Sequence, residues 1–224
     1  MSRGLGDVYK RQNLDYLISF LGGNKMAEII NNELAQEFES LLLSTHREGI
    51  DKLIAYLKLK TDFFSAPAST RFHSSCPGGL LQHSMNVYKM LKAKSQTETW
   101  KSTLSREDTI IIVSLLHDIC KANFYAVEMR NRKNEDGVWE KYPFYIIDDK
   151  NPYGHGEKSV MMIMEFMKLT AEEKYAIRWH MGFSEPKENY NALGKAMEYY
   201  PIVVALHEAD LEATYLLESG VEKQ

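Results

Sequence analysis

A histidine and an aspartate stand side by side at the end of a strongly apolar segment. His117 and Asp118 directly follow residues 110–116, which read IIIVSLL. A helix with that much continuous apolar surface is buried on most sides, and an ionised carboxylate at its end is costly without a compensating partner. A cation compensates it, because neutral imidazole and carboxylate groups together are the usual ligands of a catalytic divalent transition metal. The pair therefore predicts a metal centre.

Other imidazole and carboxyl groups also fall on the inward faces or at the ends of apolar helices. One of them lies between Gly154 and Gly156, which let the backbone approach a site closely, and the helix after it offers its positive end. Any one such residue is more often an ordinary core side chain, but several on separate helices favour joint metal binding. His207 lies one turn from Asp210 and could support the site, be simply packed or, as a less favoured alternative, bind the metal itself; this choice stays open. The further candidate ligands are His83, His155, His180 and Asp210.

Helical periodicity dominates the elements that must position these groups, so we predict a mainly α fold. A helix is expected over residues 170–180, since Thr170 and Glu173 form a T-x-x-E capping box. Another helix is expected to open at Ser105, with Asp108 three residues later as an approximate capping box.

One stretch breaks the helical rhythm. In residues 124–147, aromatic and β-branched residues surround a polar turn that reads NEDG, which predicts one short β-hairpin. No internal repeat divides the rest of the chain. We expect a non-structural tail at 1–12, a helical N-terminal lead-in at 13–64 and a catalytic core at 65–218 that contains the hairpin.

Composition narrows the classes of function. The chain has 44% hydrophobic residues, which is enough for a sizeable core, and a net charge of −4. Domains that bind nucleic-acid polymers usually carry a basic excess, so a long nucleic acid is a less favoured partner. Two cysteines form no disulfide framework or zinc knuckle, and no apolar run reaches the length of a membrane span. We expect a cytoplasmic protein without a membrane partner; the sequence predicts no oligomeric state.

The candidate ligands resemble the pattern H…HD…D of the HD superfamily of metal-dependent phosphohydrolases, over roughly residues 65–217. The segments GGLLQHS at 78–84 and LLHDICK at 115–121 are similar to the HD domain of bacterial 3′-to-5′ exoribonucleases, in which the second reads LLHDIGK. His155 and His180 match the two extra histidines of branches that hold two metals. The string PYGHGEKS resembles small phage or prophage HD proteins. His180-Met181-Gly182 departs from those branches, where two adjacent histidines often precede glycine.

This resemblance implies an HD-domain helical bundle, with the hairpin as an insertion, and a specific set of ligands. One ion would be held by His83, His117, Asp118 and Asp210, and a second by Asp118, as a bridging carboxylate, with His155 and His180. A histidine-rich set favours Mn, Fe, Co, Ni or Zn over Mg. Asp118 and Lys121 are the expected catalytic residues. Lys121 would stabilise developing charge or bind phosphate; the alternative is a solvated lysine at a helix C-terminus.

Four basic side chains are candidates for binding the substrate. Arg71 and His73 lie in the loop before the first ligand helix, and Arg130 and Arg132 lie in the hairpin. The hairpin arginines, opposite aromatic residues, could cover a nucleotide by charge and stacking. A solvated hairpin tip explains the same charges.

The predicted function is hydrolysis of a phosphate ester bond in a small nucleotide, by a monoesterase or by a phosphodiesterase that acts on cyclic or short oligonucleotides. The alternatives are a 3′-to-5′ nuclease on single-stranded nucleic acid and a non-catalytic nucleotide-binding HD domain. The resemblance does not decide among these three functions, because one fold can carry many functions.

Overall fold

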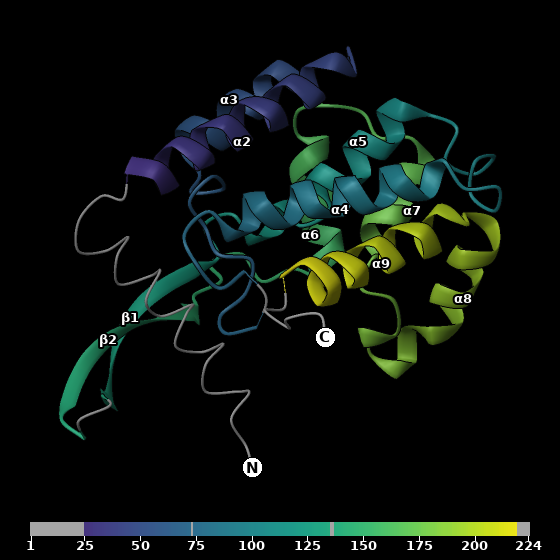
Figure 1. The fold of residues 1–224 in the computed structure, drawn as a ribbon. Coiled ribbons are helices and arrows are strands. Elements are labelled where there is room, and N and C mark those ends of the chain that lie inside the picture. The colour runs from purple at the N-terminus through teal and green to yellow at the C-terminus, as the bar shows by residue number, and fades with distance from the viewer. Residues whose placement is uncertain (1–24, 73, 135–136, 219–224) are drawn as a thin grey trace.

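The computed structural model describes residues 25–72, 74–134 and 137–218. The helices pack together, and a two-stranded hairpin extends from one side of them (Figure 1). The prediction of a mainly α fold with one short hairpin is therefore confirmed. The predicted tail at 1–12 and His73 lie outside the described residues. The longer elements are α2 (Lys25–Ser44), α3 (Ile50–Lys60), α4 (Gly79–Ser95), α5 (Glu107–Leu116), β1 (Tyr125–Lys133), β2 (Trp139–Ile147), α6 (His155–Met164), α7 (Ala171–Trp179), α8 (Tyr190–Tyr199) and α9 (Ile202–Glu212).

Short helical turns complete the description. They are η1 (Ile119–Lys121), η2 (Gly182–Ser184), η3 (Lys187–Asn189) and the π-helical η4 (Ala213–Glu218), which directly continues α9.

Helix α5 forms the centre of the bundle. Every residue from Thr109 to Leu116 is buried, as the apolar run predicts. Helix α4 packs against both α5 and α9, and α7 packs against α5, α6 and α9. Phe38 of α2 and Leu53 of α3 belong to the same apolar core as Ile112, so the described part of the predicted lead-in packs on the bundle. The division of the chain at residue 65 stays a prediction.

The two strands of the hairpin pair antiparallel over their whole length. The register runs from Tyr125 opposite Ile147 to Lys133 opposite Trp139, and no other strand extends this sheet among the described residues. The Tyr125 hydroxyl donates to the carbonyl oxygen of Ala68 at 3.1 Å and thereby fastens the base of the hairpin to the loop before α4. The far end of the hairpin projects away from the helices (Figure 1).

One of the two predicted helix caps is present and the other is wrong. The Thr170 hydroxyl accepts from the backbone N–H of Glu173, whose carboxylate accepts from the backbone N–H of Thr170. Helix α5 instead begins at Glu107, and its N-cap residue Arg106 makes no side-chain cap. Asp108 is engaged elsewhere: its carboxylate accepts hydrogen bonds from Arg106 and from the distant Arg47. The capping box is absent because the N-cap position falls on Arg106, one residue after Ser105, so Asp108 does not occupy the third helical position.

Within the described ranges, no helix combines the length and the apolar character that crossing a membrane requires.

Candidate metal centre

The predicted ligands meet at the ends of five helices. His117 caps the C-terminal end of α5, with Asp118 next to it, and His180 caps the C-terminal end of α7. His155 is the first residue of α6. The structure brings all six predicted ligands into overlapping groups whose nitrogen and oxygen atoms lie within 4.8 Å of one another, and these groups could hold a metal ion. The six residues are His83, His117, Asp118, His155, His180 and Asp210.

The two carboxylate oxygens of Asp118 face different histidines. Oδ1 lies 2.7 Å from Nε2 of His155 and 3.4 Å from Nε2 of His180. Oδ2 lies 3.6 Å from Nε2 of His83 and 3.5 Å from Nε2 of His117. One carboxylate can thus serve two groups of nitrogen ligands, which is the geometry that a bridging ligand needs.

Hydrogen bonds at Nδ1 orient two of the buried imidazole rings. Nδ1 of His117 lies 2.8 Å from the carbonyl oxygen of Ser114, and Nδ1 of His180 lies 2.7 Å from that of Ile177. A carbonyl can only accept, so each Nδ1 carries the hydrogen and each neutral ring keeps its Nε2 lone pair for the centre. Nε2 of His180 is buried and has no hydrogen-bond partner in the described part of the chain. This donor set fits a divalent transition metal, for which such an orphaned imidazole nitrogen is a normal ligand.

The charges of the cluster favour a cation at its centre. Burial opposes ionisation of Asp118, but Lys121 and the surrounding histidines hold the pKa of its carboxyl well below the usual range. Burial alone would lower the pKa of His83, but Asp210 and Glu218 raise it to about 10. Burial lowers the pKa of His117 to about 3, and nearby imidazoles contribute to that shift. The carboxylates are thus held ionised among imidazole groups, as a set of metal ligands must be.

Close backbone packing brings α6 and α7 together at the site. A Cβ atom on Gly156 would lie 2.2 Å from the carbonyl oxygen of Arg178, so only glycine permits this approach. Gly156 thus permits a close approach between two helices, α6 and α7, and the expectation that the two glycines let the backbone approach the site itself stays a prediction. At Gly154, in contrast, a Cβ would meet the movable carboxylate of Glu157.

His207 supports the site without joining the cluster. Its Nδ1 donates to the carbonyl oxygen of His180 at 2.7 Å. Its ring covers Gly182, where a Cβ would lie 2.4 Å from the imidazole and where φ is +54°. His207 is absent from the groups of described residues that could hold an ion, so this geometry favours support or packing over metal ligation.

Lys121 and the partly exposed ligands mark the open side of the cluster. Nζ of Lys121 lies 2.6 Å from Oδ2 of Asp118, and the lysine side chain is 15% exposed. His155 is 29% and Asp210 is 18% exposed, whereas His83 and His180 are at most 1% exposed. Burial would lower the pKa of Lys121, but Asp118 raises it above the ordinary value, so the ammonium stays charged.

The structure does not bring the predicted substrate-binding arginines to the cluster through any described contact. Arg71 is exposed, and its guanidinium lies over the neighbouring Phe72 ring. Arg130 pairs with Glu128 and lies 3.9 Å from the centre of the Phe144 ring. Arg132 pairs with Glu140 and lies over the Tyr142 ring. These contacts fit the alternative of a hairpin surface with its own internal partners, and the substrate-binding role of the four residues stays a prediction.

Two residues of the site were missed in the sequence. Sγ of Cys120 lies 3.2 Å from Nδ1 of His155, and Cys120 forms a further possible metal-binding group with Asp118 and His155. Glu218 contacts Nδ1 of His83. Cys120 could have been found from its position, because it lies two residues after the predicted ligand Asp118. Glu218 follows Asp210 by about two helical turns, which places the two on one face of a continuous helix, but a carboxylate in that position also fits a solvated surface.

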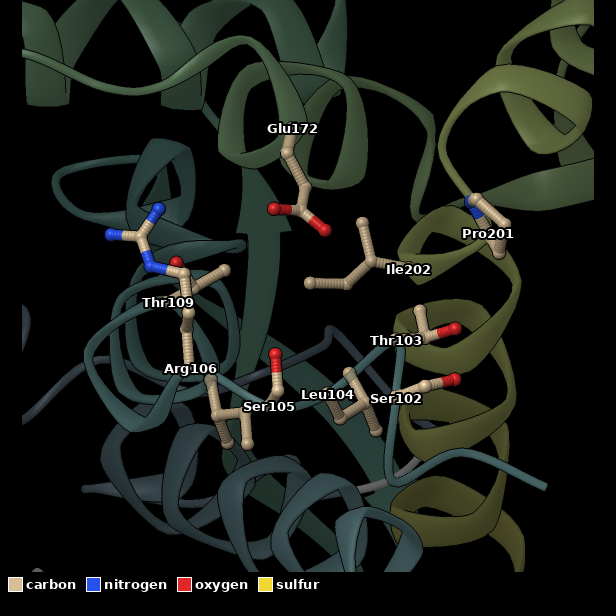
Figure 2. Close-up of a pocket in the computed structure, with 10 residues that line it drawn as sticks. Ser102, Thr103, Leu104, Ser105, Arg106, Thr109, Glu172, Pro201 and Ile202 are labelled. Atoms are coloured by element: carbon tan, nitrogen blue, oxygen red, sulfur yellow. The ribbon is translucent and has the colours of Figure 1, made fainter. Parts of the chain in front are cut away.

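A cavity of about 230 Å³ lies outside the cluster (Figure 2). Ser105, Arg106 and Thr109 line it near the start of α5, Glu172 lines it from the start of α7, and Ile202 from the start of α9. The predicted ligands of these three helices lie at or just beyond their opposite ends. The cavity is therefore separate from the candidate metal centre, and none of its lining residues is a predicted ligand.

Part of the chain is similar to a curated enzyme. It is 34% identical over 84 residues to the dihydroneopterin 2′,3′-cyclic phosphate phosphodiesterase of Methanocaldococcus jannaschii. The match covers 37% of this chain and 31% of that protein, so the chain spans about a third of the length of its relative. No family model and no solved structure matches the chain.

Proposed function

We propose that this chain is a metal-dependent phosphodiesterase of the HD type, which hydrolyses a phosphate ester bond of a small nucleotide or of a related cyclic phosphate. The gathering of four imidazole groups and two carboxylates into overlapping groups, each able to hold an ion, carries this proposal. The similarity over part of the chain to a cyclic phosphate phosphodiesterase supports the type of reaction.

The proposed centre gives each ligand a place. His83 and His117 would serve the Oδ2 side of Asp118, together with Asp210, which lies 3.2 Å from Nε2 of His83. His155 and His180 would serve the Oδ1 side. Divalent metals in such two-sided centres polarise phosphoryl oxygens and provide a nucleophile at neutral pH. Asp118 would hold both halves of the centre in a fixed relation, and the hydrogen bonds at Nδ1 of His117 and His180 keep their rings aimed at it.

Lys121 has the properties of a phosphate-binding group. Its ammonium is held charged beside Asp118 and is accessible at the rim. In the proposed reaction, Nζ binds a non-bridging oxygen of the phosphate and orients the phosphorus toward the centre. Because negative charge on that oxygen grows in the transition state, a fixed cation at this position lowers the barrier.

A small substrate fits the surface charge better than a polymer does. Long nucleic acids gain most of their affinity from many unpaired Lys and Arg side chains. The chain carries a net charge of −4, and the hairpin cations Arg130 and Arg132 already pair with Glu128 and Glu140.

The decisive experiment is turnover by metal-reconstituted protein. Metal-stripped protein is loaded separately with Mn, Fe, Co, Ni, Zn or Mg and incubated with 2′,3′- and 3′,5′-cyclic nucleotides, dinucleotides, mononucleotides, short RNA and short DNA. Chromatography then identifies the products. We expect metal-dependent opening or cleavage of a phosphodiester in a small nucleotide; progressive shortening of RNA or DNA would instead indicate a nuclease.

A matched pair of variants tests whether the reaction belongs to this centre. Asp118→Asn should reduce turnover by more than about 100-fold, since loss of a group that merely supports a metal ligand already costs about 10–100-fold. Asp51→Asn makes the same chemical change on the exposed surface of α3 and should leave turnover unchanged. Turnover that persists in Asp118→Asn would refute the assignment.

A further inference from the structure

Glu218 is a buried carboxylate at the end of η4. Its side chain is only 3% exposed. One oxygen lies 3.1 Å and the other 3.2 Å from Nδ1 of His83. The same carboxylate accepts hydrogen bonds from the Asn86 side-chain amide at 2.9 Å and from the Ser74 hydroxyl at 2.8 Å. Three donors thus hold the carboxylate in place against one edge of the imidazole.

The opposite edge of the same imidazole faces the candidate metal centre. Nε2 of His83 lies 3.2 Å from Oδ1 of Asp210 and 3.3 Å from Nε2 of His117. Since Nδ1 of His117 donates to a carbonyl, Nε2 of a neutral His117 carries a lone pair and no hydrogen. His83 therefore stands between a carboxylate that orients it and the point where the Nε2 atoms converge.

This arrangement differs from that of the other two fully buried histidines. His117 and His180 are tied to carbonyls of their own helices, three residues earlier in the chain. The partner of His83 is instead a side chain 135 residues away in sequence. Its orientation thus depends on the docking of η4 against α4, two elements that pack together.

We infer that Glu218 is a positioning residue for His83. Its carboxylate accepts the Nδ1–H hydrogen bond, which leaves the Nε2 lone pair directed at the metal and makes the imidazole a stronger ligand. The inference rests on the proposed metal centre and adds to it a residue from the C-terminal helical segment.

Metal affinity distinguishes this role from a purely structural one. Wild-type protein, Glu218→Ala and Glu218→Gln are stripped of metal and titrated with Zn²⁺ in competition with a chromophoric chelator. Glu212→Ala is the matched control, because Glu212 lies on the preceding helix and pairs with Lys94 without touching a ligand. The visible absorption of Co²⁺-loaded protein reports the geometry of the ligands, and circular dichroism establishes that each variant is folded.

We expect Glu218→Ala to weaken Zn²⁺ binding by about 10–100-fold. Glu218→Gln keeps the shape of the side chain and an accepting oxygen but loses the charge. We therefore expect it to weaken Zn²⁺ binding by about 10-fold, near the lower end of that range. Both variants should shift the Co²⁺ absorption, whereas Glu212→Ala should match the wild type in both measurements. Wild-type affinity in a folded Glu218→Ala, or in Glu218→Gln where the alanine variant does not fold, would overturn the inference.

The outcomes also separate this inference from the proposed function. A wild-type protein that binds neither Zn²⁺ nor any other metal of the turnover experiment would overturn both. A wild-type protein that binds Zn²⁺ in a Glu218-dependent manner, but hydrolyses no phosphodiester in the substrate panel, would refute the proposed function alone.

Discussion

Arg47 and Glu173 form a two-pronged ion pair that joins the α2–α3 connection to the first turn of α7. Nη1 donates to Oε1 at 2.8 Å and Nη2 donates to Oε2 at 3.0 Å. The same carboxylate also accepts from the Thr109 hydroxyl and from the backbone N–H of Thr170. Its side chain is fully buried. One carboxylate therefore links the N-terminal helices, α5 and α7, far from the candidate metal centre.

Removing that charge should destabilise the fold. Glu173→Gln leaves the Arg47 guanidinium without its anionic partner, and breaking a buried pair from one side costs about 3–5 kcal/mol. Because Arg47 is 19% exposed and water relieves part of the loss, we expect about 3 kcal/mol. Urea unfolding monitored by circular dichroism measures the change. Glu198→Gln, in an exposed pair with Lys195 on α8, serves as the control; equal effects of the two substitutions would contradict the prediction.

The same pair predicts how stability varies with pH. Burial would raise the pKa of the Glu173 carboxyl, but hydrogen bonds from Arg47 and Thr170 lower it below its ordinary value of 4.5. A carboxyl whose pKa is lower in the folded state contributes stability above pH 4.5, and that stability is lost as the pH falls through the lowered pKa. The difference in unfolding free energy between wild type and Glu173→Gln should therefore shrink below pH 4.5. Urea midpoints between pH 7 and pH 3 test this, and a constant difference would argue against it.

Gly156 should be intolerant of a side chain. In Gly156→Ala the new Cβ would press on the carbonyl oxygen of Arg178, and backbone on both sides leaves little room to yield. We expect a loss of about 1–3 kcal/mol in stability, together with fewer bound ions per chain because α6 moves away from α7. Thermal melting and elemental analysis of Zn²⁺-loaded protein measure the two effects.

Gly194 provides the matched control for that substitution. It lies inside α8, where a Cβ would meet no atom within 4 Å. Gly194→Ala should therefore stabilise the protein by up to about 1 kcal/mol, because alanine favours helix over glycine, and leave the bound metal unchanged. Similar melting of the two alanine variants would show that the α6–α7 contact is not tight.

Lys121 should affect turnover more than metal binding. Lys121→Met keeps much of the length of the side chain and removes its charge, so we expect turnover of a phosphodiester to fall by about 100-fold or more. The Zn²⁺ content should stay at the wild-type value, since Lys121 is not a ligand. Lys195→Met, an equivalent change on the exposed surface of α8, should alter neither property. Loss of metal together with turnover would assign Lys121 a supporting role instead.

The sequence predicted a group of candidate ligands because imidazole and carboxyl side chains stand in apolar helical segments, where they are unusual. His117 and Asp118 follow a run of buried apolar residues, and the structure places both in groups with other predicted ligands. Gly156 marks a close approach to the backbone of Arg178. The hairpin was equally visible, since alternating strand residues surround a short polar turn. These patterns lie within short segments of the sequence, so they can be recognised without knowledge of the tertiary fold.

The remaining features depend on contacts between distant segments. Asp108 pairs with Arg47 across 61 residues, a contact that the local pattern around Ser105 does not indicate. Glu218 reaches His83 across 135 residues, and nothing in its neighbours in sequence distinguishes it from a surface carboxylate. The arginines of the hairpin have the composition of a nucleotide-binding surface, but their contacts are with partners on the same two strands.

The imidazole and carboxylate groups of the centre arrive from chain positions as far apart as His83 and Asp210. An ion held there would cross-link helices that unfolding must separate, because the scattered groups of an unfolded chain form no comparable chelate. The thermal stability of the loaded protein would then depend on the concentration of free metal. A chelating agent would therefore lower the stability of the loaded protein by removing the ion, although it does not act on the apolar core.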